Sequence, residues 1–301
     1  MIPAVSVHLT SFNRLELLKI AVDSVFAQTF GDWELVITDD GSEQPTRDYL
    51  RSLLGDARVR VVWLEHCGNL SVVRNAGLAA TRAPLVAFLD SDDWWLPHKL
   101  ATQLAAMAGQ PQRLWSYTRE ILVDTQGAPV SNPGYTEWLP YQGQIAAPLL
   151  RVEAMISAPT VIVARALLDA AGGFDPEQRY VGDYELWVRL ALRSDVIALS
   201  EPLTCVRIHR DHYTKDRVQV HRMWVRLYGK LATLVPARLR AICLSRRAAS
   251  MLRVAVGLWI AGERREALAT AWKSMRAGWP YGHWWLAVLR TARDAVRRSL
   301  R

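Results

Sequence analysis

Three carboxylates follow the apolar run PLVAF in the segment FLDSDDWW, namely Asp90, Asp92 and Asp93. Strand packing does not require three charges at one strand end, so their density calls for a chemical reason. Hard divalent cations prefer oxygen ligands, commonly one or two carboxylates together with substrate phosphates. Asp90 and Asp92 therefore predict a clamp for a metal-bound diphosphate. Capping of a helix that opens near Pro97 is the alternative use of Asp92 or Asp93.

A second acidic pair, Asp39 and Asp40, lies in the segment TDDGS at the end of another apolar run. We expect these carboxylates to face the same site as Asp90. Turn formation explains Asp40, Gly41 and Ser42 equally well, because these residue types favour tight turns.

Arg74 and Asn75, in VVRNAG, lie near the start of an expected helix. A guanidinium at this position suits a phosphate or a base edge, and an ordinary surface arginine is the alternative.

Two further residues are candidates for chemistry later in the chain. Asp183 precedes the amphipathic segment YELWVRLAL, where it could act as a general base or cap a helix that begins at Tyr184. His209, in VRIHRDH, ends an expected strand, where it could complete an octahedral metal site or contact a neighbouring loop.

The first 90 residues alternate apolar strand segments with helical segments. We expect strands at residues 4–10, 33–40, 59–65 and 84–90, and helices at residues 15–26, 46–54 and 71–81. This alternation predicts a mostly parallel sheet with crossover helices, and ligands of such sheets bind at the carboxyl ends of the strands. The polar residues at those ends should therefore meet at one site.

Residues 109–150 are rich in Gly, Pro and Gln and lack clear periodicity, so we expect a loop-rich insert. After it we expect a strand at 160–164, a turn at Gly172 and Gly173, a helix at 184–193, and strands near 196–199 and 203–208. Beyond residue 215 the pattern is helical. Four helices are expected, at about 220–234, then up to 260, at 264–276 and after Pro280.

The two parts of the chain differ in charge. Residues 1–215 contain 19 Lys and Arg against 25 Asp and Glu, whereas residues 216–301 contain 18 against 4. We therefore expect a domain boundary near 215. Six tryptophans lie among the arginines of the second part, a mixture that suits an anionic membrane surface or nucleic acid. We favour the membrane surface, with a plain structural cap as the next interpretation and nucleic acid last.

Composition limits the class of protein. A chain of 301 residues with 50% hydrophobic and 22% charged residues forms one large or two modest globular domains. Its longest uncharged run has 13 residues, too short for a membrane-spanning helix. Cys67, Cys205 and Cys243 are scattered, so we expect buried thiols and neither a disulfide framework nor a zinc site. No secretory signal pattern opens the chain, and we expect a cytoplasmic protein.

Six blocks together resemble glycosyltransferase family 2, the inverting enzymes with the A-type nucleotide-sugar fold. The blocks are VSVHLTSFNR, WELVITDDGS, VVRNAGLAAT, PLVAFLDSDDWW, GGFDP and GDYELWVRLAL, and they cover about residues 3–210 in the family's order. The resemblance implies that residues 1–215 form a catalytic α/β domain and that residues 216–301 form a basic helical region without a family motif.

The resemblance also implies roles for individual residues. The expected donor-binding residues are Thr10, Phe12, Arg14, Asp39, Asp40, Arg74, Asp90 and Ser91. Asp92 is expected to bind Mn²⁺ or Mg²⁺, with His209 as a further metal ligand. Asp183 stands where the family has its catalytic base. The family's usual pair there is Glu-Asp, whereas this chain has Gly182 and Asp183.

By this resemblance the chain moves a sugar from a nucleotide-diphosphate donor, with a UDP-sugar as the first choice. The acceptor would be a hydroxyl of a glycan or a lipid-linked acceptor in bacterial surface polysaccharide synthesis, reached at the inner face of the membrane. Two alternatives stay open. One is a degenerate, non-catalytic family member that acts as a membrane-associated scaffold. The other is a nucleotidyltransferase, although LTSFNR lacks the glycines of a phosphate-gripping loop.

Overall fold

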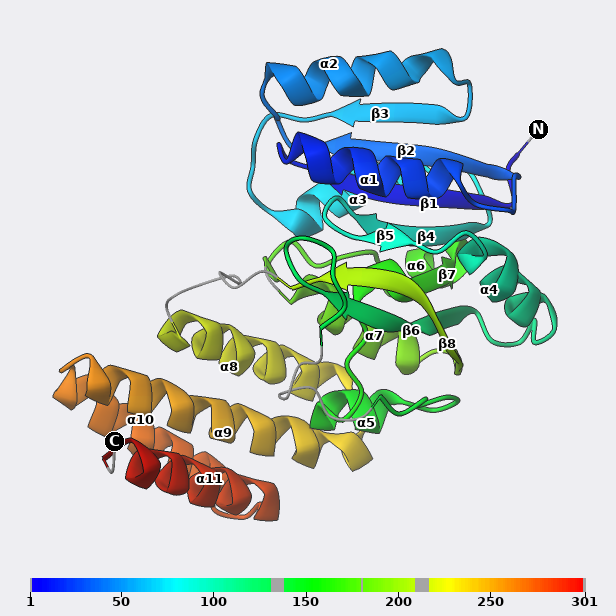
Figure 1. The fold of residues 1–301 in the computed structure, drawn as a ribbon. Helices are drawn as coiled ribbons and strands as arrows, with labels where there is room; N and C mark the ends of the chain where they lie inside the picture. Colours follow the sequence, from blue (N-terminus) through cyan, green and yellow to red (C-terminus); the bar gives the residue numbers. More distant parts are fainter. Residues whose placement is uncertain (1, 131–137, 180, 209–216, 300–301) are drawn as a thin grey trace. The chain divides into compact units, whose positions relative to one another are not determined.

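A computed structural model describes residues 2–130, 138–179, 181–208 and 217–299 (Figure 1). The chain divides into two compact units, Met1–Arg210 and Asp211–Arg301. The domain boundary expected near residue 215 lies in the segment 209–216, outside the described residues, and stays a prediction.

The first unit contains one mixed α/β sheet and its flanking helices. Its strands are β1 (Val5–Ser11), β2 (Trp33–Asp39), β3 (Val59–Trp63), β4 (Leu85–Asp90), β5 (Trp94–Trp95), β6 (Trp115–Val123), β7 (Val161–Ala164) and β8 (Val196–Arg207). Its α-helices are α1 (Leu15–Phe26), α2 (Gln44–Ser52), α3 (Leu70–Ala80), α4 (Lys99–Ala108), α5 (Ala146–Arg151), α6 (Arg165–Ala171) and α7 (Gly182–Ala191). Short 3₁₀ turns occupy Leu53–Gly55 and Ala158–Thr160.

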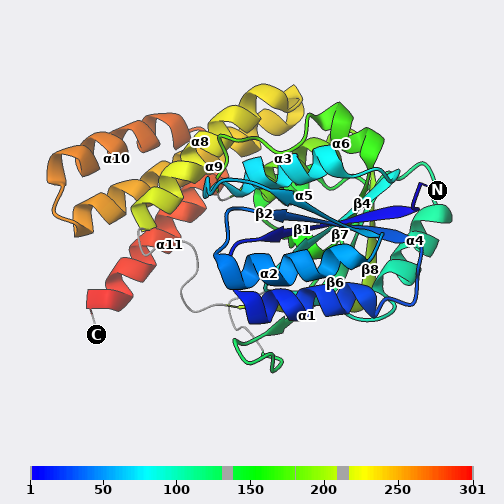
Figure 2. The same ribbon diagram turned by 90° about the horizontal axis from the view of Figure 1, so that it is seen from above.

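The sheet has the strand order β3-β2-β1-β4-β7-β6-β8-β5 within the described residues. The first four strands pair in parallel, which confirms the expected alternation of strands and crossover helices. Beyond β4 the pairing is mixed, because β7 is antiparallel to both β4 and β6, while β6 and β8 are parallel. Helices α1 and α2 lie on one face of the sheet, and α3 and α6 lie on the other (Figure 2).

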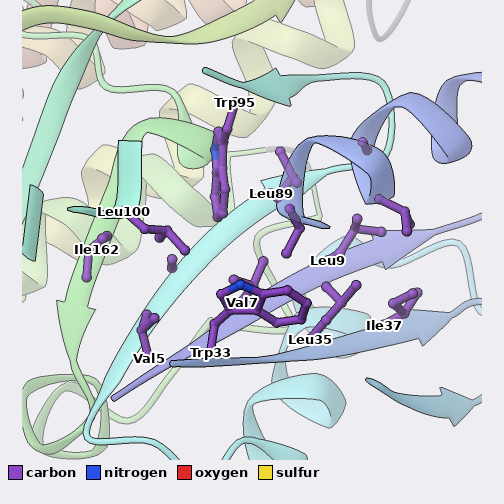
Figure 3. Close-up of a cluster of buried hydrophobic side chains, with 14 of the residues drawn as sticks. Val5, Val7, Leu9, Trp33, Leu35, Ile37, Leu89, Trp95, Leu100 and Ile162 are labelled. Atoms are coloured by element: carbon purple, nitrogen blue, oxygen red, sulfur yellow. The ribbon is translucent and has the colours of Figure 1, made fainter. Parts of the chain in front are cut away.

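Alternate residues of β1 serve the two faces of the sheet. Val5, Val7 and Leu9 are fully buried in the main apolar cluster, which includes residues of β2, β4 and α1 (Figure 3). Each such side chain contributes roughly 1.5–3 kcal/mol when it is removed from water. The intervening residues point to the α3 side, where Gly77 approaches His8 and Thr38 so closely that a Cβ atom would overlap both. In β1 one face is therefore apolar, and the other carries the polar residues Ser6, His8 and Thr10.

Two expectations for the second half of this unit are wrong. The presumed loop-rich insert at 109–150 contains β6, which pairs with two strands, and α5. The two strands expected near 196–199 and 203–208 form one strand, β8, with an irregular register opposite Arg119. Neighbouring Gly, Pro and Gln residues obscure β6 in the sequence, and Pro202 sits in β8 where the regular pairing is interrupted.

The second unit is helical, as the sequence predicts. Its helices are α8 (Arg217–Leu234), α9 (Ala237–Ile260), α10 (Arg264–Gly278) and α11 (Gly282–Ser299). Helix α9 contacts each of the other three. Small residues allow close helix packing in this unit: at Gly257 of α9 a Cβ would meet Val218 of α8, and at Gly278 of α10 it would meet the Trp284 ring of α11.

Candidate active site

The strand register brings polar residues together at the carboxyl ends of β1, β2 and β4. Ser11 pairs with Asp39, and Thr10 pairs with both Thr38 and Asp90. Because these strands are parallel, their ends form one edge of the sheet. The candidate residues from the first 93 positions therefore gather at the edge that the sequence predicts.

Arg74 and Asp90 form the centre of this edge. Arg74, on α3, is buried, and its Nη2 lies 2.8 Å from Asp90 Oδ1 and 3.2 Å from Oδ2. Thr10 Oγ1 donates to the same Oδ1 over 3.4 Å. The alternative that Arg74 is an ordinary surface residue is wrong. Its guanidinium is held where it can meet additional negative charge.

Arg14 contacts the second carboxylate of the acidic motif. Its Nη1 lies 2.7 Å from Asp92 Oδ2, in a pair that solvent partly reaches. The alternative that Asp92 or Asp93 caps the next helix is wrong, because α4 begins at Lys99 and its N-cap position is His98. Asp92 therefore forms an ion pair with Arg14 at this edge of the sheet.

The backbone at Asn13 and Arg14 is left-handed, with φ of 54° at both residues. Hydrogen bonds to the neighbouring loop hold this conformation. The Asn13 N–H donates to Ser42 Oγ over 2.7 Å, and the Glu43 N–H donates to Asn13 Oδ1 over 2.8 Å. The loops that follow β1 and β2 are thereby tied together.

Asp39 and Ser11 leave buried polar atoms without partners. Asp39 is fully buried, and its Oδ2 accepts from the Ser42 N–H over 3.1 Å. Within the described part of the chain, Asp39 Oδ1 and Ser11 Oγ have no hydrogen-bond partner. Most buried polar atoms are hydrogen-bonded, so this adjacent pair is suited to bind polar groups of a ligand.

Asp40 holds a loop that supports Phe12. Its carboxylate accepts from the backbone N–H groups of Cys67 and Gly68 over 2.9 and 3.0 Å, and His66 Nδ1 lies 3.0 Å from Oδ2. The His66 ring stacks on Phe12 with centroids 4.1 Å apart. Phe12 stays exposed and offers an aromatic face beside Asp39 and Arg14. Cys67 is exposed, so its expected burial is wrong.

Asp183 lies in the first turn of α7 and shares the electrostatic field of Arg74 and Asp90. Its Oδ1 accepts from the Tyr184 N–H over 2.8 Å, but the alternative that Asp183 caps a helix beginning at Tyr184 is wrong, because α7 begins at Gly182 and its N-cap position is Val181. Burial raises the pKa of the Asp183 carboxyl, and Asp90 raises it further, while Arg74 and the Tyr184 N–H oppose the shift. A carboxylate with a raised pKa is a better proton acceptor near neutral pH.

His8 is a residue of this region that the sequence analysis did not single out. It is buried in β1, and its Nε2 lies 3.1 Å from Thr38 Oγ1. Burial, assisted by Arg74 and opposed by Asp90, lowers the His8 pKa to about 3. His8 is therefore neutral at physiological pH. The alternation of β1 places it two residues before Thr10 on the same face, which is the signal that could have identified it.

Asp93 and Arg207 were also missed as a pair. The Arg207 N–H donates to Asp93 Oδ1 over 2.8 Å, and Arg207 Nε donates to the Asp92 carbonyl over 3.1 Å. Burial raises the pKa of Asp93 well above its ordinary value, and the Asp92 and Asp90 charges add to this shift. Asp93 thus anchors the acidic segment to β8, which leaves Asp90 and Asp92 as the carboxylates at the site.

The residues at this edge suit a hard metal ion that is shared with a phosphate ligand. Within the described residues no group of three or more His, Cys, Asp and Glu side chains could form a metal site. Mg²⁺ needs only one or two carboxylates when phosphates and water supply the other ligands. Asp92 is a carboxylate of this type, and because its Oδ2 is paired with Arg14 Nη1, a metal ion there would share the carboxylate with that guanidinium or displace it. His209 lies outside the described residues, so its expected part in metal binding stays a prediction. Ser91 is buried beside these carboxylates.

The mixed sheet has polar residues at the carboxyl ends of its parallel strands. This architecture is that of an A-type glycosyltransferase fold. The model of glycosyl transferase family 2 matches residues 6–157, and the chain belongs to this family. It is 38% identical over 129 residues to the putative teichuronic acid biosynthesis glycosyltransferase TuaG of Bacillus subtilis, a match that covers 42% of this chain and about half, 51%, of TuaG. A longer match, 26% identical, covers 73% of this chain and 83% of WfgD of Escherichia coli, named as a UDP-Glc:alpha-D-GlcNAc-diphosphoundecaprenol beta-1,3-glucosyltransferase.

Solved structures show the same fold. S. aureus TarS (residues 1–349), solved with UDP-GlcNAc, superposes with a TM-score of 0.68 at 17% identity, covering 92% of this chain and 81% of that structure. The mannosyltransferase PcManGT from Pyrobaculum calidifontis, solved with GDP-Man and Mn²⁺, gives 0.60 at 16% identity, covering 98% and 81%. No helix within the described residues is long and apolar enough to span a membrane.

The structure also explains the departure from the family's usual Glu-Asp pair. A Cβ atom at Gly182 would overlap Ser71 Oγ, which donates to the Gln178 carbonyl over 2.9 Å. Helix α3 therefore occupies the space that a side chain at position 182 needs. Asp183 is the acidic residue that remains at this position.

Proposed function

We propose that this protein is an inverting, metal-dependent glycosyltransferase. It moves a sugar from a nucleotide-diphosphate donor, with a UDP-sugar as the first choice, to a hydroxyl of a glycan or lipid-linked acceptor in bacterial surface polysaccharide synthesis. The names of the relatives TuaG and WfgD support this acceptor class. One observation carries the proposal: the guanidinium of Arg74 contacts Asp90, and its positive charge also lowers the pKa of the Asp183 carboxyl. The positive charge of Arg74 thus influences both a residue assigned to donor binding, Asp90, and the proposed base, Asp183.

The donor base and ribose are assigned to the ends of β1 and β2. Phe12 offers an exposed aromatic face, and the unpaired Asp39 Oδ1 offers an acceptor to a ring N–H. Thr10 and Asp90 lie beside them in register. Asp40 acts indirectly in this assignment, because its hydrogen bonds hold the loop whose His66 supports Phe12.

The diphosphate is assigned to the space near Arg14, Arg74, Ser91 and Asp92. Two guanidinium groups and a carboxylate with a bound cation would balance the negative charge that develops as the sugar leaves. A bound Mg²⁺ or Mn²⁺ on Asp92 supplies Lewis-acid stabilisation of that diphosphate. Calorimetric titration of Mn²⁺ with donor present should show weaker metal-dependent donor binding in Asp92→Asn, and an unchanged titration would contradict the assignment.

We assign to Asp183 the role of general base, which accepts the proton of the acceptor hydroxyl. Direct displacement on the side of the sugar opposite the leaving diphosphate forms the new C–O bond, breaks the anomeric C–O bond and inverts the anomeric centre. The hydroxyl proton moves to the Asp183 carboxylate. The raised pKa of this group favours that transfer, and the transfer requires the ionised form, so turnover should fall as pH decreases through that raised pKa.

The decisive experiment compares Asp183→Asn with Asp169→Asn, which removes an exposed carboxylate on α6. A thermal-shift screen of UDP-, GDP- and dTDP-sugars with Mn²⁺ first identifies the donor. Asp183→Asn should then bind that donor nearly as wild type does but lose about 10²- to 10⁴-fold in turnover, the usual contribution of general base catalysis. Asp169→Asn should keep full turnover. Wild-type turnover in Asp183→Asn would remove it from this role.

A non-catalytic scaffold is the second candidate. The ordered polar contacts of Asp90, Asp39 and Asp183 favour catalysis over decay, because a scaffold does not need them. Slow hydrolysis of the donor sugar by the wild-type protein, and its loss in Asp183→Asn, would support the transferase. Donor binding without any hydrolysis or transfer would support the scaffold.

A further inference from the structure

Helix α10 packs through its small residues. Ala267, Ser274 and Gly278 are buried and recur at helical spacing on one face. Ser274 Oγ donates to the Ala248 carbonyl of α9 over 2.7 Å and accepts from Trp284 Nε1 of α11 over 2.9 Å. Among the large apolar residues of this helix, Met275 packs against the cluster that includes Ala248 and Trp284, whereas Leu268 and Trp272 remain exposed.

The opposite face of α10 carries those large apolar residues outward. Leu268 is 62% exposed, Trp272 is 58% exposed and Trp279 is 62% exposed. The spacing of Arg265, Leu268, Trp272, Arg276 and Trp279 is three or four residues at each step, so they share one face of the helix. We call these five residues the outer strip of α10. An ordinary surface helix buries its large apolar residues, whereas α10 exposes Leu268 and Trp272 beside its charged residues.

The exposed apolar surface continues onto α11. Trp285 Nε1 donates to the Trp279 carbonyl over 3.2 Å, and the two indole rings meet edge to face with centroids 4.9 Å apart. Leu286 and Leu289 follow on α11 and are at least half exposed. Contiguous apolar patches of this kind on a protein surface mark interaction sites.

Exposed apolar residues also lie at the end of α9, just before the turn into α10. Trp259 and Ile260 are exposed at the end of α9, and the Arg264 guanidinium lies 4.0 Å from the Trp259 ring centroid. Arginine stacked on tryptophan places a cation beside an apolar ring, as at the boundary between lipid headgroups and acyl chains.

Charge decides which partner this surface fits. Residues 216–301 contain 18 basic and 4 acidic residues. Arg265, Lys273 and Arg276 are exposed on α10, while Glu266 on the same helix is paired with Arg222 over 2.8 Å. A partner that accepts leucine and tryptophan side chains between arginines must offer both an apolar interior and negative charge. Nucleic acid offers the charge but no apolar phase for Leu268, Leu286 or Ile260.

We propose that the outer strip of α10, with the adjoining apolar residues of α11, docks the protein onto an anionic lipid bilayer. Trp272 and Trp279 enter the headgroup boundary, Leu268 reaches the acyl region, and Arg265 and Arg276 contact anionic headgroups. This docking does not depend on the assigned chemistry of the first unit. It gives residues 216–301 a role of their own.

The test is sedimentation of the full-length protein with vesicles of phosphatidylcholine alone and of phosphatidylcholine mixed with phosphatidylglycerol. Two variants of equal charge are compared. The strip variant replaces Arg265 and Arg276 of the outer strip and the neighbouring exposed Lys273 with Gln, and the control variant replaces the exposed Arg226, Arg238 and Arg240 of α8 and α9 with Gln. Each basic residue at an anionic surface contributes about 1 kcal/mol, so binding should fall on the order of a hundredfold in the strip variant. The control variant should lose much less.

A third variant, Leu268→Ser with Trp272→Ser, keeps every charge and should also lose vesicle binding, because the substitutions remove the apolar anchor but not the internal packing of α10. Circular dichroism of each variant should match wild type. Equal binding to both kinds of vesicle would overturn the proposal. Equal loss in the strip and control variants would also overturn it, as would preferential binding to a single-stranded oligonucleotide or a dimer that only these substitutions dissociate.

Discussion

The two units of the chain differ in where they place several of their cations and tryptophans. In residues 1–210, Arg74 and Lys99 are buried, and Trp115 and Trp187 lie in the core. In residues 211–301, basic residues are mostly exposed, and Trp259, Trp272, Trp279 and Trp285 are exposed as well. These residues of the first unit position groups within the protein, whereas these residues of the second unit lie at its surface, although Trp284 of the second unit is buried. A count of charged residues along the sequence finds the difference in sign but not this difference in placement.

The comparison predicts that loss of a buried cation from the first unit is far more damaging than loss of an exposed one from the second. Arg74→Gln leaves the Asp90 carboxylate without its guanidinium and should cost about 3 kcal/mol of stability, as expected when one partner of a buried pair is removed. Arg240→Gln, at an exposed position of α9, should change stability by less than about 0.5 kcal/mol. Native-state hydrogen exchange of the β4 and α9 amides measures the two effects separately. Equal effects would end the distinction between the units.

The pH dependence of stability sharpens the comparison through His8. In the unfolded chain its pKa is near 6.5, whereas in the folded protein it is about 3. As pH falls, His8 of the unfolded chain is therefore protonated before His8 of the folded protein. The contribution of His8 to the free energy of unfolding is complete above pH 6.5 and declines as pH falls from 6.5 to about 3. Between pH 7.5 and 5 this amounts to about 2 kcal/mol.

His8→Gln should lose that share of the pH dependence, because glutamine does not titrate. His98→Gln, at an exposed position next to α4, should keep it. The free energy of unfolding at both pH values, measured by urea denaturation of each variant, checks the prediction. An identical pH dependence in wild type and His8→Gln would contradict the neutral state of the buried histidine.

The smallest expected effect concerns Lys99 of the first unit and Lys273 of the second. Lys99 is fully buried, its Nζ has no hydrogen-bond partner within the described residues, and it lies 3.9 Å from the Trp95 ring centroid. Burial holds the pKa of Lys99 well below its ordinary value. Lys99→Met keeps a side chain of similar length and removes the unpaired amine. It should therefore stabilise the protein by about 1 kcal/mol at pH 7.

The gain should shrink as pH approaches 10.5, because the unfolded chain then loses the same proton. Lys273→Met, at an exposed position, should leave stability within about 0.5 kcal/mol of wild type. Thermal unfolding at pH 7 and 10 distinguishes the two variants. Destabilisation by Lys99→Met at both pH values would show that its contact with Trp95 outweighs the cost of burial.

The sequence predicts the parallel half of the fold well because its signals are local. The apolar segments of β1, β2 and β4 stand between helical segments, and the ends of α1 match the expected range of 15–26. The sequence does not reveal β6 or the continuity of β8. Their pairing depends on each other and on β7, which are distant in the chain, and Gly, Pro and Gln residues surround β6.

The site shows the same limit. Asp39 and Asp90 stand out in the sequence because they end apolar strands, whereas Asp183 stands at a helix start, where acidic residues are common, and is singled out by the resemblance to the family. The partners that position them do not stand out. His66 is in a polar loop, Arg207 is one arginine among many, and Ser71 explains Gly182 only through the packing of α3 against the start of α7. The residue types in the sequence indicate the chemistry of the site. The residues from distant segments that position them are found only in the three-dimensional structure.

The paired left-handed residues Asn13 and Arg14 have a consequence for how a ligand is captured. A left-handed non-glycine residue costs roughly 1–2 kcal/mol, and the hydrogen bonds to Ser42 and Glu43 offset this cost before any ligand arrives. The loop to which we assign the nucleotide is therefore preorganised, and binding need not order it. Affinity lost by breaking the Asn13 contacts should accordingly appear as an entropic penalty on binding, with the contacts in the final complex unchanged.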